Sequence, residues 1–200
     1  MKKTLLLVLV LLLSVSVLGC AGEGTAPQKA DEASLKDFFP LTVGSSWQYK
    51  GEGNEYASFT RKVLFAEGDK VQIAEDNGGT VSASVFRTAE DAITCVFSRG
   101  EEYDGVNLLK EESNENYVVL KAPLKAGTKW EAQGEVREIV DTNAVVDTPA
   151  GKFEDCIKVS IKLEHSTMNE YFRAGIGMVK REFESEGLKV TSTLEKYDIK

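Results

Sequence analysis

The sequence predicts a mainly β domain of antiparallel strands, preceded by an export signal that ends at a lipid attachment site. Three observations support this prediction. A basic start and an apolar run precede Cys20, apolar and polar residues alternate through most of the later chain, and glycine-containing turns separate the alternating runs. A period of two is typical of strands that bury one face and expose the other.

The first residues have the composition of a secretory signal. Lys2 and Lys3 precede an apolar run of 14 residues from Leu5 to Leu18, and Gly19 follows it. As a helix the run would rise about 21 Å, which is short of the roughly 30 Å hydrocarbon core of a membrane. We therefore expect residues 1–19 to be a cleaved signal peptide and not a permanent membrane span.

The end of this run, Val17-Leu18-Gly19-Cys20, resembles the lipobox of bacterial lipoproteins. The resemblance implies that the Cys20 thiol carries a diacylglyceryl group and that cleavage occurs just before it. At least two acyl chains, such as palmitate, are needed for stable anchoring. The alternative is an ordinary secretory signal whose cleavage site happens to lie near a cysteine.

Composition argues against polyanionic partners. Removal of residues 1–19 takes away two lysines and no acids, which leaves 22 basic and 32 acidic residues and a net charge of −10. Nucleic acids and anionic lipid surfaces both require basic protein surfaces. We therefore expect no nucleic-acid partner, and we expect membrane attachment through the lipid alone.

The remainder divides into a tether and one domain. Residues 20–34 are small and polar, and such a segment reaches roughly 20 Å as a flexible linker. Residues 35–200 are expected to form a single antiparallel β domain. The segment Asp31–Phe39 is predicted to be one short helix, capped by Ser34 or Asp31 and ended by Pro40.

Alternation in the domain predicts the strands. Ile157–Glu164 places four aliphatic side chains on one face and four polar groups on the other. Similar runs are Phe59–Phe65, Val71–Ile73, Val81–Val85, Ile93–Phe97, Val179–Phe183 and Leu188–Leu194. The turn at residues 148–151 is expected to join strands near Val140–Asp147 and Phe153–Leu163.

Two hairpin registers follow from matching the apolar faces, because a slip of one residue reverses every side chain. A three-residue loop, Asn77-Gly78-Gly79, would pair Val71 with Val85 and Ile73 with Ala83, and we prefer it to a two-residue turn. A two-residue loop, Glu186-Gly187, would pair Phe183 with Val190, Val179 with Leu194 and Glu184 with Lys189.

A short repeat occurs 83 residues apart. Residues 40–47 and 123–130 share the pattern P-L-x-x-G-[ST]-x-W, and the two segments contain both tryptophans of the chain. Each proline would fix an extended entry, each glycine a turn, and each tryptophan the start of a strand. We interpret Trp47 and Trp130 as structural caps on the core, with a ligand-facing aromatic pair as the alternative.

No catalytic, cofactor-binding or metal-binding residues are predicted. His165 is the only histidine and is expected to be exposed at a strand end. Gly175-Ile176-Gly177 lacks the third glycine of a dinucleotide-binding loop and is expected to be a bend or bulge. The acidic segment Glu101–Glu115 lacks calcium-loop spacing, so we expect a solvated loop. Cys95 and Cys156 either pair outside the cytoplasm or remain buried free thiols.

Three segments carry a family resemblance: FFPLTVGSSW at residues 38–47, TPAGKFEDC at 148–156 and YFRAGIGMVK at 171–180. Together they resemble a group of uncharacterised bacterial envelope lipoproteins, similar in broad design to the LolA/LppX type. That likeness implies a strongly curved antiparallel sheet, a half-barrel or open barrel, whose concave face can hold acyl chains.

Three functional hypotheses follow. The first is a non-catalytic, membrane-anchored lipoprotein that binds a hydrophobic ligand on a curved sheet. The second is an interaction or scaffold module of the cell envelope, with a core filled by its own side chains, and the third is an esterase or glycosidase. The expected location is the outer face of the cell membrane. In a host with two membranes it is the periplasm, and the outer membrane is favoured because no aspartate follows Cys20.

Overall fold

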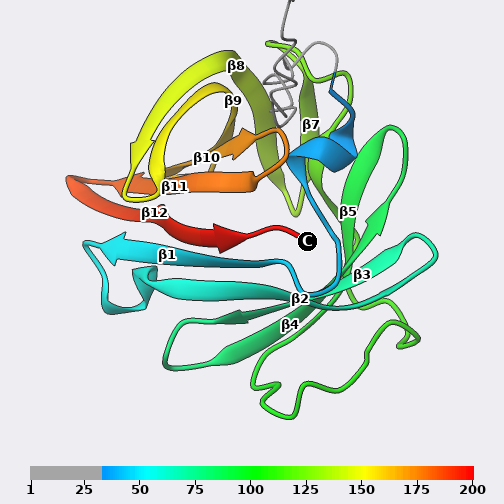
Figure 1. Cartoon of the computed structure of the whole chain (residues 1–200). Coiled ribbons are helices and arrows are strands. Elements are labelled where there is room, and N and C mark those ends of the chain that lie inside the picture. The colour runs from blue at the N-terminus through cyan, green and yellow to red at the C-terminus, as the bar shows by residue number, and fades with distance from the viewer. Residues whose placement is uncertain (1–32) are drawn as a thin grey trace, which may run out of the picture.

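The computed structural model describes residues 33–200, which form one antiparallel sheet of twelve strands (Figure 1). The predicted signal peptide, Cys20 and most of the predicted tether lie outside the described residues. No helix within residues 33–200 has the length and apolarity needed to cross a membrane.

The twelve strands fall into two runs of six. The first run is β1 (Ser46–Glu52), β2 (Phe59–Glu67), β3 (Lys70–Asp76), β4 (Val81–Thr88), β5 (Ala92–Arg99) and β6 (Tyr117–Lys121). The second is β7 (Lys129–Ala132), β8 (Glu135–Thr148), β9 (Gly151–Lys162), β10 (Thr167–Arg173), β11 (Gly177–Ser185) and β12 (Leu188–Asp198). Strands β1 and β12 pair in the middle of the sheet, so β6 and β7 are its two edges.

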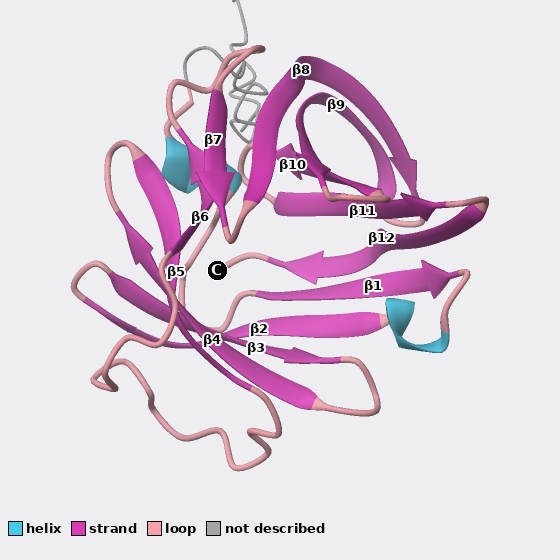
Figure 2. Cartoon of the chain, turned by 180° about the vertical axis from the view of Figure 1, so that it is seen from behind, coloured by secondary structure: helices cyan, strands magenta, loops and turns pink. Residues whose placement is uncertain are grey.

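The sheet curves until these edges meet. Figure 2 shows β6 and β7 next to each other at the seam, where the indole Nε1 of Trp130 donates a hydrogen bond of 2.9 Å to the carbonyl of Val118. The result is a nearly closed barrel. Closing a sheet on itself in this way removes most exposed strand edges. The prediction of a mainly β, strongly curved antiparallel sheet is confirmed.

The period of two located most of the strands. In β9 the side chains of Ile157, Val159 and Ile161 are buried in the core, as the alternation predicts. The other predicted runs also lie within strands. Strands β6 and β10 were not predicted from alternation. In β10 the pattern is obscured because Asn169 and Glu170, both polar, are buried.

The predicted N-terminal helix over Asp31–Phe39 is wrong. The described part of this segment contains one 3-10 turn, η2 (Leu35–Phe38), and the other 3-10 turn of residues 33–200 is η3 (Glu55–Ala57). Ser34 occupies the N-cap position of η2, where its backbone N and its Oγ donate to Asp37 Oδ2 at 2.7 and 3.0 Å. Packing decides the conformation: Phe38 and Phe39 are both buried, and Gly175 N donates to the Asp37 carbonyl at 2.7 Å.

One predicted hairpin is confirmed and one is wrong. Phe183 pairs with Val190 and Glu184 with Lys189, as predicted for the β11–β12 hairpin. In the β3–β4 hairpin, however, Val71 pairs with Phe86, because the loop contains four residues, 77–80, and not three.

The β3–β4 register was mispredicted because both faces of the sheet are buried there. The loop formed by residues 100–116, between β5 and β6, packs over the outer face of β3, β4 and β5. Leu108 and Leu109 of this loop join Ala83, Val85, Val96 and Phe97 in a second hydrophobic cluster outside the barrel. Val85 therefore faces outward while Val71 faces inward, and no single apolar face existed to be matched.

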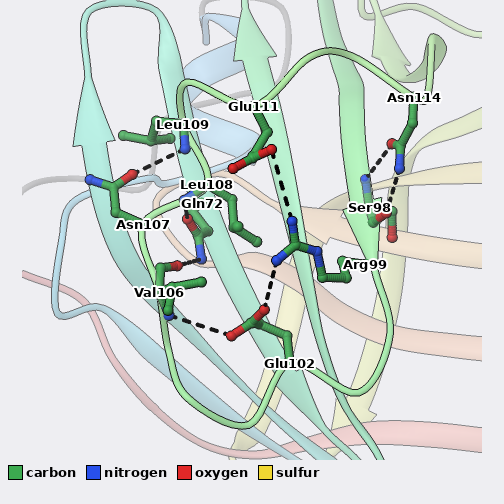
Figure 3. A network of polar contacts seen from close by, with 10 residues as sticks. All are labelled: Gln72, Ser98, Arg99, Glu102, Val106, Asn107, Leu108, Leu109, Glu111 and Asn114. Carbon is green, nitrogen blue, oxygen red and sulfur yellow. Dashed lines mark hydrogen bonds and ion pairs between the residues drawn. The ribbon is translucent and has the colours of Figure 1, made fainter.

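Gln72 fixes this loop from the outer face of β3 (Figure 3). Its side chain is fully buried, its Nε2 donates to the Val106 carbonyl at 2.8 Å, and its Oε1 accepts from Leu108 N at 2.7 Å. Most residues of the segment Glu101–Glu115 are exposed, as the prediction of a solvated loop requires, but Glu102, Leu108 and Leu109 are buried and hold the loop on the sheet. Even Glu102 is buried, where it pairs with Arg99 at 3.1 Å.

The repeated segments precede the first strand of each run of six. Trp47 is the second residue of β1 and Trp130 the second residue of β7, and each is 6% exposed. Trp47 Nε1 donates to the Ile176 carbonyl at 2.7 Å, so both indoles are held by backbone carbonyls. The interpretation of the two tryptophans as structural caps on the core is confirmed.

Candidate functional site

A cavity of about 250 Å³ lies inside the curved sheet. At about 30 Å³ per molecule this is the volume of roughly eight waters, well above the voids of ordinary cores. Strands β2, β4, β6 and β8–β11 contribute to its wall. The lining residues are Phe39, Arg61, Phe86, Tyr117, Val119, Arg137, Ile161, Met168, Glu170, Phe172, Met178 and Arg181.

Two of the three arginines in this wall form cross-strand ion pairs. Arg61 on β2 lies opposite Glu75 on β3, with Nε 2.6 Å from Oε2. Arg181 on β11 lies opposite Glu170 on β10, with Nε 3.0 Å from Oε1. Each guanidinium charge is thus offset by a carboxylate on the neighbouring strand, which compensates for part of the cost of removing it from water.

Aromatic rings support the same two arginines. The guanidinium carbons of Arg61 and Arg181 lie 5.2 and 5.7 Å from the centroid of the Phe59 ring, which stacks on Tyr49 at 4.4 Å. Burial raises the pKa of Tyr49 to about 12, although both arginines oppose the rise. Tyr49 therefore stays protonated at neutral pH and donates to the Met178 carbonyl at 2.8 Å.

Glu75, the ion-pair partner of Arg61, has a shifted pKa. Burial acts to raise the pKa of Glu75, but Arg61 and Arg181 outweigh it, and the net effect lowers the pKa below its ordinary value of 4.5. Glu75 is therefore a carboxylate at neutral pH, and its charge is committed to the arginines.

Arg137 on β8 differs from the other two arginines. It is 8% exposed, and its Nε is buried without a hydrogen-bond partner. Its Nη2 lies 3.8 Å from Glu135 Oε2, at the outer limit of an ion pair, and the Glu135 side chain is 27% exposed. Its guanidinium carbon lies 5.8 Å from the centroid of the Tyr117 ring. Arg137 is thus a buried cation with little compensation, placed at the cavity.

The three inward arginines were not predicted from the sequence, although the sequence contains a signal for them. Each arginine occupies an inward position within an alternating run, where an apolar residue is expected. Arg61 lies between Phe59 and Val63, and Arg181 lies between Val179 and Phe183. Arg137 lies two residues before the fully buried Ile139 on the same strand. A cation at an inward position that recurs on three strands would have indicated a polar site inside the barrel.

The structure places His165 away from this cavity. It lies in the turn between β9 and β10 with a 76% exposed side chain, as predicted. It borders a wide surface groove of about 540 Å³ that also includes Ser166 and Ser185. The Ser185 hydroxyl donates to the His165 carbonyl at 3.2 Å and not to its imidazole, so this contact is not a nucleophile–base pair.

The other singled-out residues have structural roles. Gly175 and Ile176 lie in the turn between β10 and β11, as expected, and Gly177 is the first residue of β11. Cys95 and Cys156 are buried free thiols on β5 and β9, which is the second of the two alternatives. Within residues 33–200 there is no group of three or more histidine, cysteine or acidic side chains arranged to hold a metal ion.

Comparison with known proteins gave two similar crystal structures. No family model matches the chain, and no curated protein does. A Bacteroides fragilis protein described as exported, with a YmcC-like fold, is 15% identical with a TM-score of 0.49 over 83% of this chain and 100% of its own. A Parabacteroides distasonis protein described as a lipoprotein is 15% identical with a TM-score of 0.45 over 80% of this chain and 98% of its own. The resemblance to the LolA/LppX type stays a prediction.

Proposed function

We propose that this chain is an exported lipoprotein, anchored through Cys20, that binds an apolar small molecule inside its barrel without catalysing a reaction. The observation that carries the proposal is the cavity of about 250 Å³ in the inner wall of the sheet. Sites for small molecules are typically concave and mostly apolar, with a few polar groups that set orientation. This cavity combines phenylalanine, methionine and aliphatic side chains with a small set of charges.

The cavity favours ligand binding over the scaffold alternative. A scaffold with a filled core would use its large side chains to occupy the interior. Trp47, Trp130 and Phe59 are indeed buried, but they leave a cavity inside the sheet unfilled, and Phe183 is only partly buried. Packing interactions are lost around an empty volume, so a protein selected only for a stable core would be expected to fill it.

The charges of the cavity do not favour hydrolysis. A glycosidase needs one carboxyl group with a raised pKa to act as the acid. The pKa of Glu75 is lowered, and Glu170 is paired with Arg181 at 3.0 Å. The described residues that line the cavity include no serine, cysteine or histidine. These features support binding without catalysis.

Native mass spectrometry of the protein purified from cells tests ligand binding. We expect a co-purifying mass on the order of 150 Da, because the cavity of about 250 Å³ has the volume of roughly eight waters. Val119→Phe, which places a ring in the cavity, should lose that mass while the circular dichroism spectrum is unchanged. Val145→Phe is the matched control, because Val145 is 54% exposed on β8, and it should retain the mass. A wild-type protein whose measured mass never includes a bound ligand would contradict the proposal.

Cell fractionation tests the anchor separately. Cys20→Ser removes the thiol that a diacylglyceryl group would modify, so the variant should leave the membrane pellet and appear in the soluble exported fraction. In a host with two membranes, the wild-type protein should fractionate with the outer membrane. Retention of the variant in the pellet would show that lipid on Cys20 is not the anchor.

A further inference from the structure

The environment of Arg137 shows what kind of group the cavity lacks. A buried guanidinium is costly unless hydrogen bonds and an opposite charge compensate for it. Arg61 and Arg181 each have a carboxylate within 3.0 Å, whereas Arg137 has only the part-exposed Glu135 at 3.8 Å. Buried polar atoms without a partner are rare in folded proteins, and Arg137 Nε is one of them. The N–H group at Arg137 Nε therefore lacks a hydrogen-bond acceptor.

We infer that the ligand is an amphipathic carboxylate, an apolar chain ending in one carboxyl group, and that Arg137 binds this group. The inference rests on the proposed function and specifies its ligand. A guanidinium presents a planar set of donors that matches the two oxygens of a carboxylate. The neighbouring Phe86, Val119, Ile161 and Phe172 offer an apolar surface to the chain.

The number of charges favours a monoanion. Glu75 and Glu170 already offset Arg61 and Arg181, so one cation remains for a ligand. A phosphate dianion would bring more charge than one arginine offsets, and a cationic ligand would meet Arg137 unfavourably. The volume of roughly eight waters also suits a chain on the order of eight carbons. Octanoate is therefore a suitable probe.

Isothermal titration calorimetry of the purified protein with four probes of equal chain length tests the inference. The probes are octanoate, octan-1-ol, octyl phosphate and octylammonium. Octanoate should bind on the order of tenfold or more tighter than octan-1-ol, since a hydrogen bond to a charged group contributes about 1.5–3 kcal/mol. Octyl phosphate should bind more weakly than octanoate, and octylammonium more weakly than octan-1-ol.

Variants assign the preference to Arg137. Arg137→Gln should abolish the advantage of octanoate over octan-1-ol, so that the two probes bind this variant with similar affinity. Arg137→Lys keeps the charge but loses the planar fork, so it should retain only part of the advantage. Arg87→Gln is the matched control, because Arg87 is exposed on the outside of β4, and it should behave like the wild type.

The outcomes separate this inference from the proposed function. If neither octanoate nor octan-1-ol binds, the proposed function fails. If the two bind equally, or octyl phosphate binds tighter than octanoate, the carboxylate is wrong while an apolar site stands. An octanoate preference that survives in folded Arg137→Gln would overturn the role of Arg137. The affinities of the wild-type protein for the four probes identify the preferred head group even if Arg137→Gln does not fold.

Discussion

Gly44 and Gly127 occupy equivalent positions at the entrances to the two runs of six strands. Their φ angles are 90° and 88°. Gly44 N donates to the Val63 carbonyl at 3.0 Å on β2, and Gly127 N donates to the Ile139 carbonyl at 2.8 Å on β8. The repeated P-L-x-x-G-[ST]-x-W segment is thus one turn used twice, and it ties the start of each run to the strand that follows.

Gly127→Ala should lower stability by about 1–2 kcal/mol, because a side chain is strained at positive φ. Nothing lies within 4 Å of the added Cβ, so the effect isolates backbone conformation from steric contact. Urea denaturation measures the loss. Gly100→Ala, where φ is not positive and the added Cβ also meets nothing, should be within about 0.5 kcal/mol of the wild type. Equal stability of the two variants would contradict the role of Gly127.

Gln72→Leu should release the loop of residues 100–116 from the outer face of the sheet. The substitution leaves the Val106 carbonyl and the Leu108 N–H without their partner, at a cost of about 1–3 kcal/mol for a buried group. Hydrogen exchange at Leu108 should accelerate, and limited proteolysis should cut within the loop first. Gln48→Leu, at an exposed glutamine on β1, should change neither readout. Unaltered exchange at Leu108 in Gln72→Leu would show that the amide does not hold the loop.

Glu75→Gln should destabilise the barrel by about 1–3 kcal/mol, because it leaves the mostly buried Arg61 without its carboxylate. The control Glu52→Gln removes an exposed partner of Lys50 and should cost less than about 1 kcal/mol.

The same variant has an acid signature. The folded pKa of Glu75 lies below its ordinary value of 4.5, so its stabilisation is present above that value and is lost as pH falls through the lower folded pKa. Stability of Glu75→Gln should therefore decline less steeply below pH 4.5 than stability of the wild type. Parallel acid denaturation curves would mean that Glu75 is not stabilised in the folded state.

Alkaline pH should destabilise the protein through its buried thiol. Burial raises the pKa of Cys156 from 9.0 to about 12. Between these values the unfolded chain ionises and the folded chain does not, so stability is intact below pH 9 and falls as pH approaches 12. The urea midpoint should decline less steeply from pH 9 to 11 in Cys156→Ala than in the wild type. Identical slopes would show that Cys156 does not contribute.

The alternation of apolar and polar residues predicted some strands and registers of this sheet, whereas others depend on tertiary packing. Alternation located β9 and β11 because one face of each strand packs in the core and the other meets water. The β11–β12 register was predictable since the two-residue loop Glu186-Gly187 leaves one favourable alignment. The same matching of apolar faces misaligned β3 with β4. Residues 100–116 cover the outer face and bury Ala83 and Val85 of β4 there, whereas the apolar side chains of β3 face inward.

Residue type and short spacing were enough to predict the β class of this protein and the position of its repeated turns. The grouping of Arg61, Arg137 and Arg181 around one cavity could not be predicted in this way, because β2, β8 and β11 surround that cavity only when the sheet curves and brings its edges together. Whether an inward arginine is paired depends on which residue lies across from it. Glu75 and Glu170 provide that partner for two of the three.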